Sequence, residues 1–153
     1  SVNKNVNIIN KRAKFEYILM DQFSAGIVLT GTEIKSIRAS KASISESFCE
    51  FNDSEELFII NMFIDEYSHG NQFNHKTRSQ RKLLLNKKEL KKLLKEVKNT
   101  GLTIVPLKLF INEKGFAKVI ISLAKGKKLF DKRQTIKNRE NKLQLARIKK
   151  TIN

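Results

Sequence analysis

Two histidines are the residues of this chain whose type and spacing come closest to catalytic chemistry. His69 and His75 stand six residues apart in a polar segment. Four cations follow close behind: Lys76, Arg78, Arg81 and Lys82. Two imidazoles beside cations can in principle cleave a phosphodiester by acid–base catalysis. We favour the simpler interpretation, in which these are solvated loop residues that help to contact a nucleic-acid backbone.

Other catalytic or metal-binding patterns are weaker still. Cysteine and histidine are too few for a structural zinc cluster, which needs four ligands at short spacings. Asp53, Glu55 and Glu56 stand together, but in an apparent turn, where a solvated acidic tip is a simpler interpretation than a magnesium site. Neither a G-x-x-x-x-G-K phosphate loop nor a G-x-S-x-G elbow occurs. The sequence therefore predicts a protein that is not an enzyme and that needs no metal or cofactor.

The carboxy-terminal segment, Gly126–Asn153, points to binding instead. It carries ten Lys or Arg against two acidic residues, a net charge of +8 and half of the protein's formal +16. Its residues are good helix formers, but its apolar side chains are too few and too scattered to form a core. We expect this tail to be loose when alone and to become helical along a polyanion that neutralises it. Nucleic acid is the polyanion that this composition favours.

The composition of the rest predicts one globular domain. The chain has 153 residues, of which 40% are hydrophobic, and its composition changes at about Lys125. We therefore divide it into a domain of residues 1–125 and a tail of residues 126–153. No window of ~20 apolar residues could span a membrane, and the first residues lack the apolar core of a secretory signal. The single cysteine, Cys49, is expected to be a buried thiol, which suits a reducing cytoplasm.

The elements that would position the basic residues are mostly strands. Strands are expected over Phe15–Thr30, bent or split at Gly26, in a hairpin of Ser43–Phe51 with Glu56–Ile64, and in a hairpin of Leu102–Ile111 with Phe116–Ala124 that turns at Gly115. Pro106 requires an edge or a bulge, because proline has no amide to donate. Short connections favour antiparallel pairing, and about six short strands close naturally into a small oligonucleotide-binding barrel. The predicted fold class is mainly β, with flanking helices.

Two helices and a loop complete the prediction. Thr32 is expected to cap a short helix. Asn86 and Glu89 form an Asn-x-x-Glu capping pattern that begins a second, amphipathic helix, and Gly101 is placed to end it. Between the two helices, Tyr67–Gln80 is polar and almost free of aliphatic residues, so we expect an exposed loop.

Basic residues also recur beside the predicted strands. They form three pairs: Lys11 with Arg12, Lys35 with Arg38, and Arg81 with Lys82. Together with the tail they indicate a nucleic-acid surface. With two Tyr and no Trp, a stacking platform for single strands is disfavoured, and recognition of folded RNA through backbone and sugar is favoured. Composition alone does not separate RNA from DNA.

Four strings in a fixed order add a resemblance: Asn10–Ala13 (NKRA), Ala25–Arg38 (AGIVLTGTEIKSIR), Arg81–Asn86 (RKLLLN) and Lys125–Arg133 (KGKKLFDKR). From about Val6 to Lys150 the chain resembles the small protein B family, the bacterial SsrA-binding proteins. The resemblance implies an RNA-binding adaptor on an oligonucleotide-binding barrel. Such an adaptor binds the tRNA-like domain of transfer-messenger RNA (tmRNA), is carried with alanyl-tmRNA by elongation factor Tu, and rescues stalled ribosomes by trans-translation. Neither DNA nor a membrane is expected as a partner.

The resemblance assigns an RNA-binding surface in the domain. Leu84 and Asn86 match contact positions of the family, although Asn86 can equally serve as a helix cap. Glu33 matches an acidic position, yet it also suits the first turn of a helix. Ser24 stands where the family often has an acid, so a carboxylate contact is impossible there. The full expected set is Lys11, Arg12, Glu33, Lys35, Arg38, His75, Arg78, Arg81, Lys82, Leu84 and Asn86.

In the tail, the resemblance implies contacts with the decoding centre and messenger channel of the small ribosomal subunit and its 16S rRNA, where the tail becomes helical. Phe130 lies where the family carries a ring that can stack on a base, and Asp131 suggests a helix start or a salt bridge. The expected set is Gly126, Lys127, Lys128, Phe130, Asp131, Lys132, Arg133, Lys137, Arg139 and Arg147. Two alternatives stay open: a general ribosomal or RNA-chaperone protein, and a small ribonuclease that uses His69 and His75.

Overall fold

β-Strands dominate the part of the chain that the structure, a computed structural model, describes, residues 6–127. The strands there are β1 (Asn7–Ile9), β2 (Tyr17–Ile27), β3 (Ala42–Ser43), β4 (Phe48–Phe51), β5 (Leu57–Ile60), β6 (Phe63–Ile64), β7 (Arg81–Leu84), β8 (Thr103–Ile111) and β9 (Ala117–Gly126). The helices are α1 (Ala13–Glu16), α2 (Gly31–Arg38) and α3 (Lys87–Thr100), with a 3₁₀ turn at Asn71–Phe73. The predicted tail, apart from Gly126 and Lys127, lies outside the described residues.

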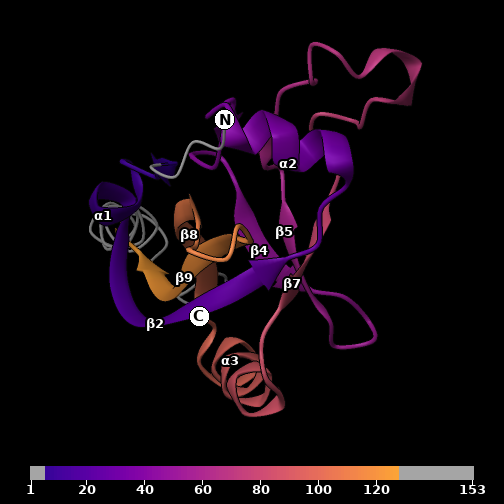
Figure 1. Ribbon diagram of the computed structural model, residues 1–153. Helices are drawn as coiled ribbons and strands as arrows, with labels where there is room; N and C mark the ends of the chain where they lie inside the picture. The colour runs from indigo at the N-terminus through magenta and orange to yellow at the C-terminus, as the bar shows by residue number, and fades with distance from the viewer. Residues whose placement is uncertain (1–5, 128–153) are drawn as a thin grey trace, which may run out of the picture.

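The antiparallel strand pairings close into a barrel. One edge of β8 pairs with β9 over its whole length, and the other edge pairs first with β4 and then with β1. From β4 the pairing continues through β5, β7 and β2 back to β9. The circuit β8–β4–β5–β7–β2–β9 is therefore closed (Figure 1), and the prediction of a mainly β, barrel-like fold is confirmed.

The two long hairpin strands carry the bulges that closure needs. The β8–β9 register shifts between Pro106 and Lys108, so Pro106 stands at a bulge as expected. Gly115 makes the hairpin turn with a φ of 87°, a conformation that residues with a Cβ rarely adopt. In β2, however, the irregularity lies between Leu19 and Gln22. The expected bend at Gly26 is wrong, because Gly26 pairs regularly with Lys118 on one side and Leu84 on the other.

The other predicted hairpin is confirmed at its centre and divided at its ends. β4 and β5 pair from Phe48–Ile60 to Phe51–Leu57 around the polar turn. A turn at Ile44–Ser47, closed by a 2.6 Å hydrogen bond from the Ser47 hydroxyl to the Ile44 carbonyl, separates β3 from β4. Asn61, with a φ of 64°, separates β5 from β6. β3 and β6 therefore leave the barrel and pair with each other as a separate two-stranded sheet.

Both predicted helices form, with one correction. α3 begins at an Asn86–Glu89 capping box and ends at Gly101, whose φ is 70°, as expected. α2 is capped by Thr30 rather than Thr32, because the Thr30 side chain accepts from the Glu33 amide and the Glu33 carboxylate accepts from the Thr30 amide. β1, α1 and β7 were not predicted, since segments of three or four residues carry too little periodicity.

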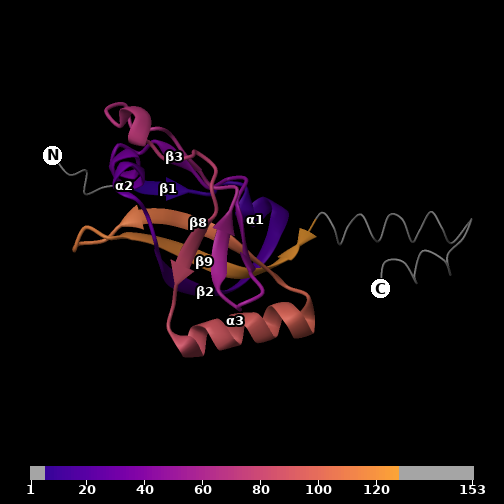
Figure 2. The ribbon, with the colours of Figure 1, turned by 90° about the vertical axis from the view of Figure 1, so that its right-hand side faces the viewer.

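The core fills the barrel with aliphatic side chains, among them Ile37, Ile59, Leu93, Leu109 and Ile121, none of them exposed to solvent. Cys49 belongs to this core, and burial raises the pKa of its thiol, so the prediction of a buried thiol is confirmed. α2 and α3 lie at opposite ends of β7, and α1 lies beside the end of β9 (Figures 1 and 2). Among residues 6–127, no helix is both long and apolar enough to cross a membrane.

Candidate nucleic-acid interface

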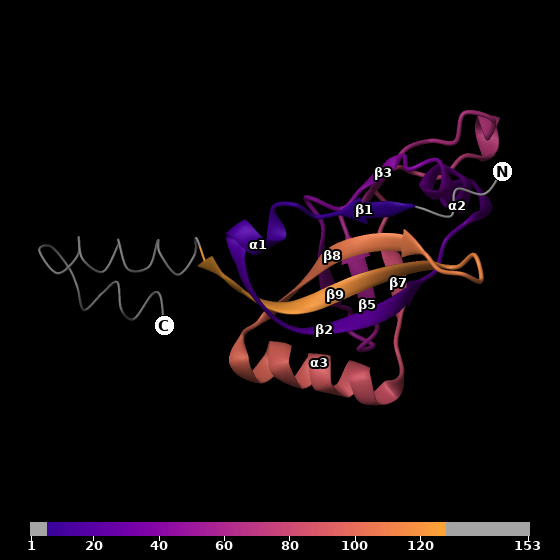
Figure 3. The same ribbon diagram turned by 60° about the vertical axis from the view of Figure 1, so that its left-hand side comes forward.

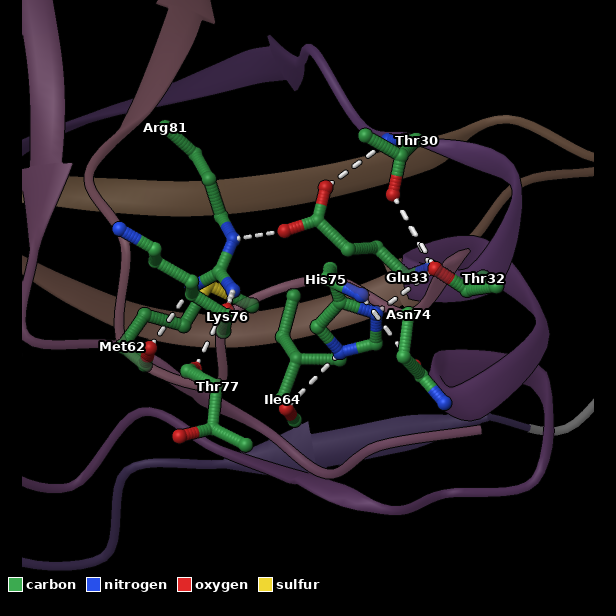
Figure 4. A network of polar contacts seen from close by, with 10 residues as sticks. All are labelled: Thr30, Thr32, Glu33, Met62, Ile64, Asn74, His75, Lys76, Thr77 and Arg81. Carbon is green, nitrogen blue, oxygen red and sulfur yellow. Dashed lines mark hydrogen bonds and ion pairs between the residues drawn. The ribbon is translucent and has the colours of Figure 1, made fainter. Parts of the chain in front are cut away.

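A buried ion pair joins α2 to β7. The Arg81 Nε lies 2.5 Å from Glu33 Oε2, and both side chains are almost fully buried, with 2% and 4% of their surface exposed. The rest of the guanidinium donates to three backbone carbonyls, of Met62 (2.7 Å), Lys76 (3.0 Å) and Thr77 (3.1 Å) (Figure 4). Arg81 thus satisfies the carbonyls of the incoming loop, and Glu33 neutralises its charge.

His75 fastens the same loop to the first turn of α2. Its Nε2 lies 3.0 Å from the Ile64 carbonyl and its Nδ1 lies 2.8 Å from the Thr32 hydroxyl (Figure 4). A carbonyl only accepts, so Nε2 carries a proton, and in the neutral ring Nδ1 accepts from Thr32. Asn74 closes the loop itself: its amide accepts from the Tyr67 N–H at 3.0 Å and donates to the Tyr67 carbonyl at 2.7 Å.

These contacts show which predicted site residues of this end are bonded inside the protein and which are free to contact a ligand. Glu33 and Arg81 are buried and held by each other, and both ring nitrogens of the half-buried His75 are engaged inside the protein. Three of the eleven expected residues thus brace the loop instead of facing solvent. The polar loop predicted as exposed is only partly so, because its polarity serves these internal bonds.

Two predicted site cations of this end are exposed. Lys35 is exposed and its Nζ lies 5.4 Å from the centre of the Tyr67 ring. Arg78 is exposed, donates to the Asn61 carbonyl and side chain at 3.1 and 3.2 Å, and lies 5.2 Å from the Phe63 ring. Arg38 is half-buried. Exposed positive charge therefore flanks the loop, whereas the buried charges of Glu33 and Arg81 neutralise each other.

Two predicted residues, Lys82 and Leu84, lie on the outer face of β7, β2 and β9. There they adjoin Ser24, Gly26 and Lys118, and we call these five residues the Leu84 surface. Leu84 is 51% exposed. It pairs with Gly26, which pairs on its other side with Lys118. A Cβ built at Gly26 would lie 3.5 Å from Leu84 Cβ and 3.8 Å from Lys118 Nζ, so the three positions adjoin. An exposed leucine beside bare glycine backbone lets a ligand approach the sheet closely.

Charge at the edges of this surface comes from two lysines. Lys82 Nζ lies 2.6 Å from Glu56 Oε2, in a pair that is about 40% exposed on both sides. The hydrogen bond from Lys82 lowers the pKa of the Glu56 carboxyl, with smaller contributions from Asn52 and from the lysine charge. Lys118 was not predicted, although the alternation in Ala117-Lys118-Val119 would have placed it outward. Its position relative to β2 depends on register, which the sequence alone did not supply.

Asn86 and Arg12 have local roles in the structure. The Asn86 carboxamide oxygen accepts from the Glu89 amide at 2.8 Å, so Asn86 does cap α3. Arg12 pairs with Glu16 at 3.1 Å, and Lys11 is exposed beside it. Lys127 donates to the Lys14 carbonyl at 3.0 Å. α1 and the point where the tail leaves the barrel are thus neighbours (Figure 3).

The predicted tail contacts beyond that point lie outside the described residues: Lys128, Phe130, Asp131, Lys132, Arg133, Lys137, Arg139 and Arg147.

The structure brings Lys82 and Leu84 together with Gly26 and Lys118 on one surface. It places the α2 end and the α1 end elsewhere on the barrel (Figure 1).

The pair of histidines has no arrangement for catalysis in the structure. The His69 ring packs edge-on against Tyr67, with centroids 5.4 Å apart, whereas His75 is committed to Thr32 and Ile64. Within the described part of the chain, no three His, Cys, Asp or Glu side chains come together in a way that could hold a metal ion.

Comparison with known proteins agrees with this geometry. The family model described as "SmpB protein" matches residues 7–151. An SsrA-binding protein of Flavobacterium psychrophilum is 67% identical over 147 residues, covering 96% of this chain and 97% of the relative. An SsrA-binding protein of Bacteroides thetaiotaomicron is 56% identical, covering 94% and 95%.

Solved structures give the same result. A chain from a structure described as "tmRNA-SmpB: a journey to the center of the bacterial ribosome" superposes with a TM-score of 0.66 at 46% identity. The match covers 80% of this chain and 85% of that one. The model match and the coverage of close relatives extend over nearly the whole sequence, barrel and tail alike. The chain therefore belongs to the SmpB protein family.

Proposed function

We propose that this protein is an RNA-binding adaptor that binds the tRNA-like domain of tmRNA and delivers it to stalled ribosomes for trans-translation. The observation that carries the proposal is the Leu84 surface, an exposed leucine beside bare glycine backbone with lysines on both sides. Membership of the SmpB family and the SsrA-binding relatives support the identity of the RNA.

The surface is suited to a folded RNA in which an unpaired base or a sugar is presented to protein. Leu84 offers an apolar contact to the face of a base, and Gly26 lets the backbone of the RNA come close. Lys82 and Lys118 bind the phosphates on either side, which contributes affinity without reading sequence. Ser24 supplies a hydroxyl, which donates and accepts, where a carboxylate would only accept. This chain therefore makes a neutral contact at that position.

The remaining predicted residues complete the adaptor. Lys11, Arg12, Lys35, Arg38 and Arg78 contribute positive charge around the barrel, while Glu33, Arg81 and His75 hold α2 and the loop in place. The tail, including Gly126 and Lys127, enters the decoding centre and messenger channel of the small subunit, contacts 16S rRNA phosphates and becomes helical there. Elongation factor Tu carries the complex through alanyl-tmRNA. The setting is the bacterial cytoplasm.

A titration at moderate salt tests the proposal. Three RNAs of similar length are compared: the tRNA-like domain of tmRNA, an elongator tRNA and an unstructured RNA. The full-length protein and a version that ends at Lys127 are measured side by side. We expect both proteins to prefer the tRNA-like domain, because specificity lies on the barrel.

The opposite result identifies a different protein. Equal binding to all three RNAs, lost with the tail, would mean a general ribosomal or RNA-chaperone protein held by charge alone. Replacing Leu84 by Ala gives a finer control, since it removes apolar contact without changing charge. A nonspecific polycation would bind as before.

A further inference from the structure

Helix α3 carries an unusual concentration of lysine on one side. Six of its 14 residues are Lys, and all six are exposed: Lys87, Lys88, Lys91, Lys92, Lys95 and Lys98. At 100° per residue these side chains fall within an arc of about 140°. Glu89 and Glu96 project outside that arc. The apolar Leu90, Leu93 and Val97 lie opposite, on the side that packs against the barrel. We call this arc the lysine face.

Two of the six lysines are paired with acidic side chains. Lys92 Nζ lies 2.8 Å from Asp21 Oδ2, and Lys98 Nζ lies 3.5 Å from Glu55 Oε2. Among residues 6–127, no acidic oxygen lies within 4.0 Å of the ammonium groups of the other four lysines. Like charges three and four residues apart on a helix repel one another. In the protein without a ligand, the lysines of α3 therefore repel one another, and a bound polyanion would reduce this repulsion.

The lysine face adjoins the Leu84 surface. α3 begins at Lys87, three residues after Leu84, which is the last residue of β7. On its flank, Lys92 contacts β2 twice, at Asp21 and at the Phe23 ring (5.9 Å from the ring centre). β2 is also the strand that carries Ser24 and Gly26. From the Leu84 surface the helix extends beneath the barrel (Figure 2), and its 14 residues give it a length of about 21 Å.

We propose that the lysine face binds the phosphate backbone of an RNA helix that continues from the RNA seated on the Leu84 surface. Lys87, Lys91 and Lys95 follow one another at about 6 Å along the helix axis, which suits successive phosphates of one strand. The contacts are to backbone, so they set the direction in which the RNA leaves the barrel without reading its sequence. This inference rests on the proposed function and adds a second contact region for the same RNA.

The test compares two triple variants of the full-length protein. Replacing Lys87, Lys91 and Lys95 by Gln removes three charges from the lysine face, while Gln remains a good helix former. Replacing Lys41, Lys108 and Lys114 by Gln removes the same charge from other elements. Each protein is titrated with the tRNA-like domain that retains its adjoining base-paired stem, and with the same domain after that stem has been shortened.

With the stem present, we expect the lysine-face variant to bind more weakly than both the wild type and the control. The slope of log K against log salt should fall by about 3, because three lysines no longer neutralise phosphates and each accounts for about one unit of slope. Between about 50 and about 200 mM salt, the wild type should therefore lose roughly 60-fold more affinity than the variant. With the stem shortened, the two triple variants should bind alike. Thermal unfolding of the lysine-face variant should occur at the same temperature as wild type or higher, because repulsion has been removed.

Two outcomes would overturn the inference. One is an unchanged salt slope, or an equal loss with both RNAs. The other is a variant that binds the tRNA-like domain normally but binds small ribosomal subunits more weakly, which would place ribosomal RNA on the lysine face. Failure of the proposed function is a separate result: the wild type itself would then bind the tRNA-like domain no better than an unstructured RNA.

Discussion

The α2 end of the barrel and the Leu84 surface use the same kinds of side chain in opposite ways. At the α2 end, a carboxylate, a guanidinium and an imidazole are buried or half-buried and bonded to one another or to backbone. On the Leu84 surface the two lysines are only half-buried, and the six lysines of the adjoining lysine face are exposed, four of them without an acidic partner in the described residues. The first region positions a loop, whereas the second is free to bind. Residue type alone does not distinguish these roles; burial and pairing do.

The largest effect should follow from breaking the buried ion pair. Replacing Arg81 by Met leaves the Glu33 carboxylate buried without its partner and removes the donor from three carbonyls. Removing one member of a buried pair typically costs about 3–5 kcal/mol, so the free energy of unfolding in denaturant should fall by that order. Arg78→Met removes an exposed guanidinium and is the matched control, with a loss below about 1 kcal/mol.

Adding Glu33→Gln to Arg81→Met sharpens the same comparison. The double variant should recover part of the lost stability, because no unpaired charge is left buried. If Arg81→Met alone lowered the free energy of unfolding no more than Arg78→Met, the Glu33–Arg81 pair would not stabilise the fold. The α2 end would then not differ from the rest of the surface.

A smaller loss of stability is expected when the loop is released from α2. His75→Ala removes the bonds to Thr32 and Ile64 and leaves a partly buried carbonyl without its donor, which costs about 1–3 kcal/mol. Amide hydrogen exchange should rise across residues 65–80 while the barrel strands stay protected. His69→Ala, which removes only an edge-on ring contact, should change neither. Equal exchange in both variants would contradict the bracing role of His75.

On the Leu84 surface the expected effects reverse, with affinity changing more than stability. Leu84→Ala should leave the free energy of unfolding within about 0.5 kcal/mol, since the side chain is half exposed. It should weaken binding to the tRNA-like domain by about fivefold, because covering the exposed half of a leucine contributes about 1 kcal/mol. Phe116→Ala, at a position 63% exposed in the β8–β9 turn, tests whether any exposed apolar side chain would do the same. A similar loss in both variants would remove the special role of this surface.

The sequence predicted the features that depend on neighbouring residues better than those that depend on contacts between distant residues. The Asn86–Glu89 capping box, the Gly101 and Gly115 turns and the Pro106 bulge each depend on residues close together in the chain, and each was correctly predicted. The Thr30 cap obeys the same local Thr-x-x-Glu rule, so a signal for it existed although Thr32 was expected. Local chemistry therefore sufficed for most elements.

The roles of the individual site residues were harder to predict, because they depend on contacts distant in sequence. Glu33 and Arg81 are 48 residues apart, and no pattern around either one shows that they meet in the core. Lys118 joins Gly26 through the β2–β9 register, which shifts at the irregularity between Leu19 and Gln22. Sequence reasoning therefore found the strings that line the site, but could not separate the residues that brace it from those that face outward.

The smallest expected effect concerns Lys82. Its ammonium group is paired with the Glu56 carboxylate in the structure, whereas we propose that it binds an RNA phosphate. The hydrogen bond from Lys82 lowers the pKa of the Glu56 carboxyl. The stability from this pair is therefore present above the unfolded-state pKa of Glu56 and is lost as pH falls through the lower folded-state value. If an RNA phosphate takes the Lys82 ammonium, Glu56 loses that bond and gains a nearby negative charge, so its pKa should rise toward or above its ordinary value. An NMR titration of the Glu56 side-chain carboxyl carbon, with and without the tRNA-like domain, measures this change. If the pKa of the Glu56 carboxyl were the same with and without RNA, Lys82 would remain bonded to Glu56 in the complex. Lys82 would then be a bracing residue and not an RNA contact.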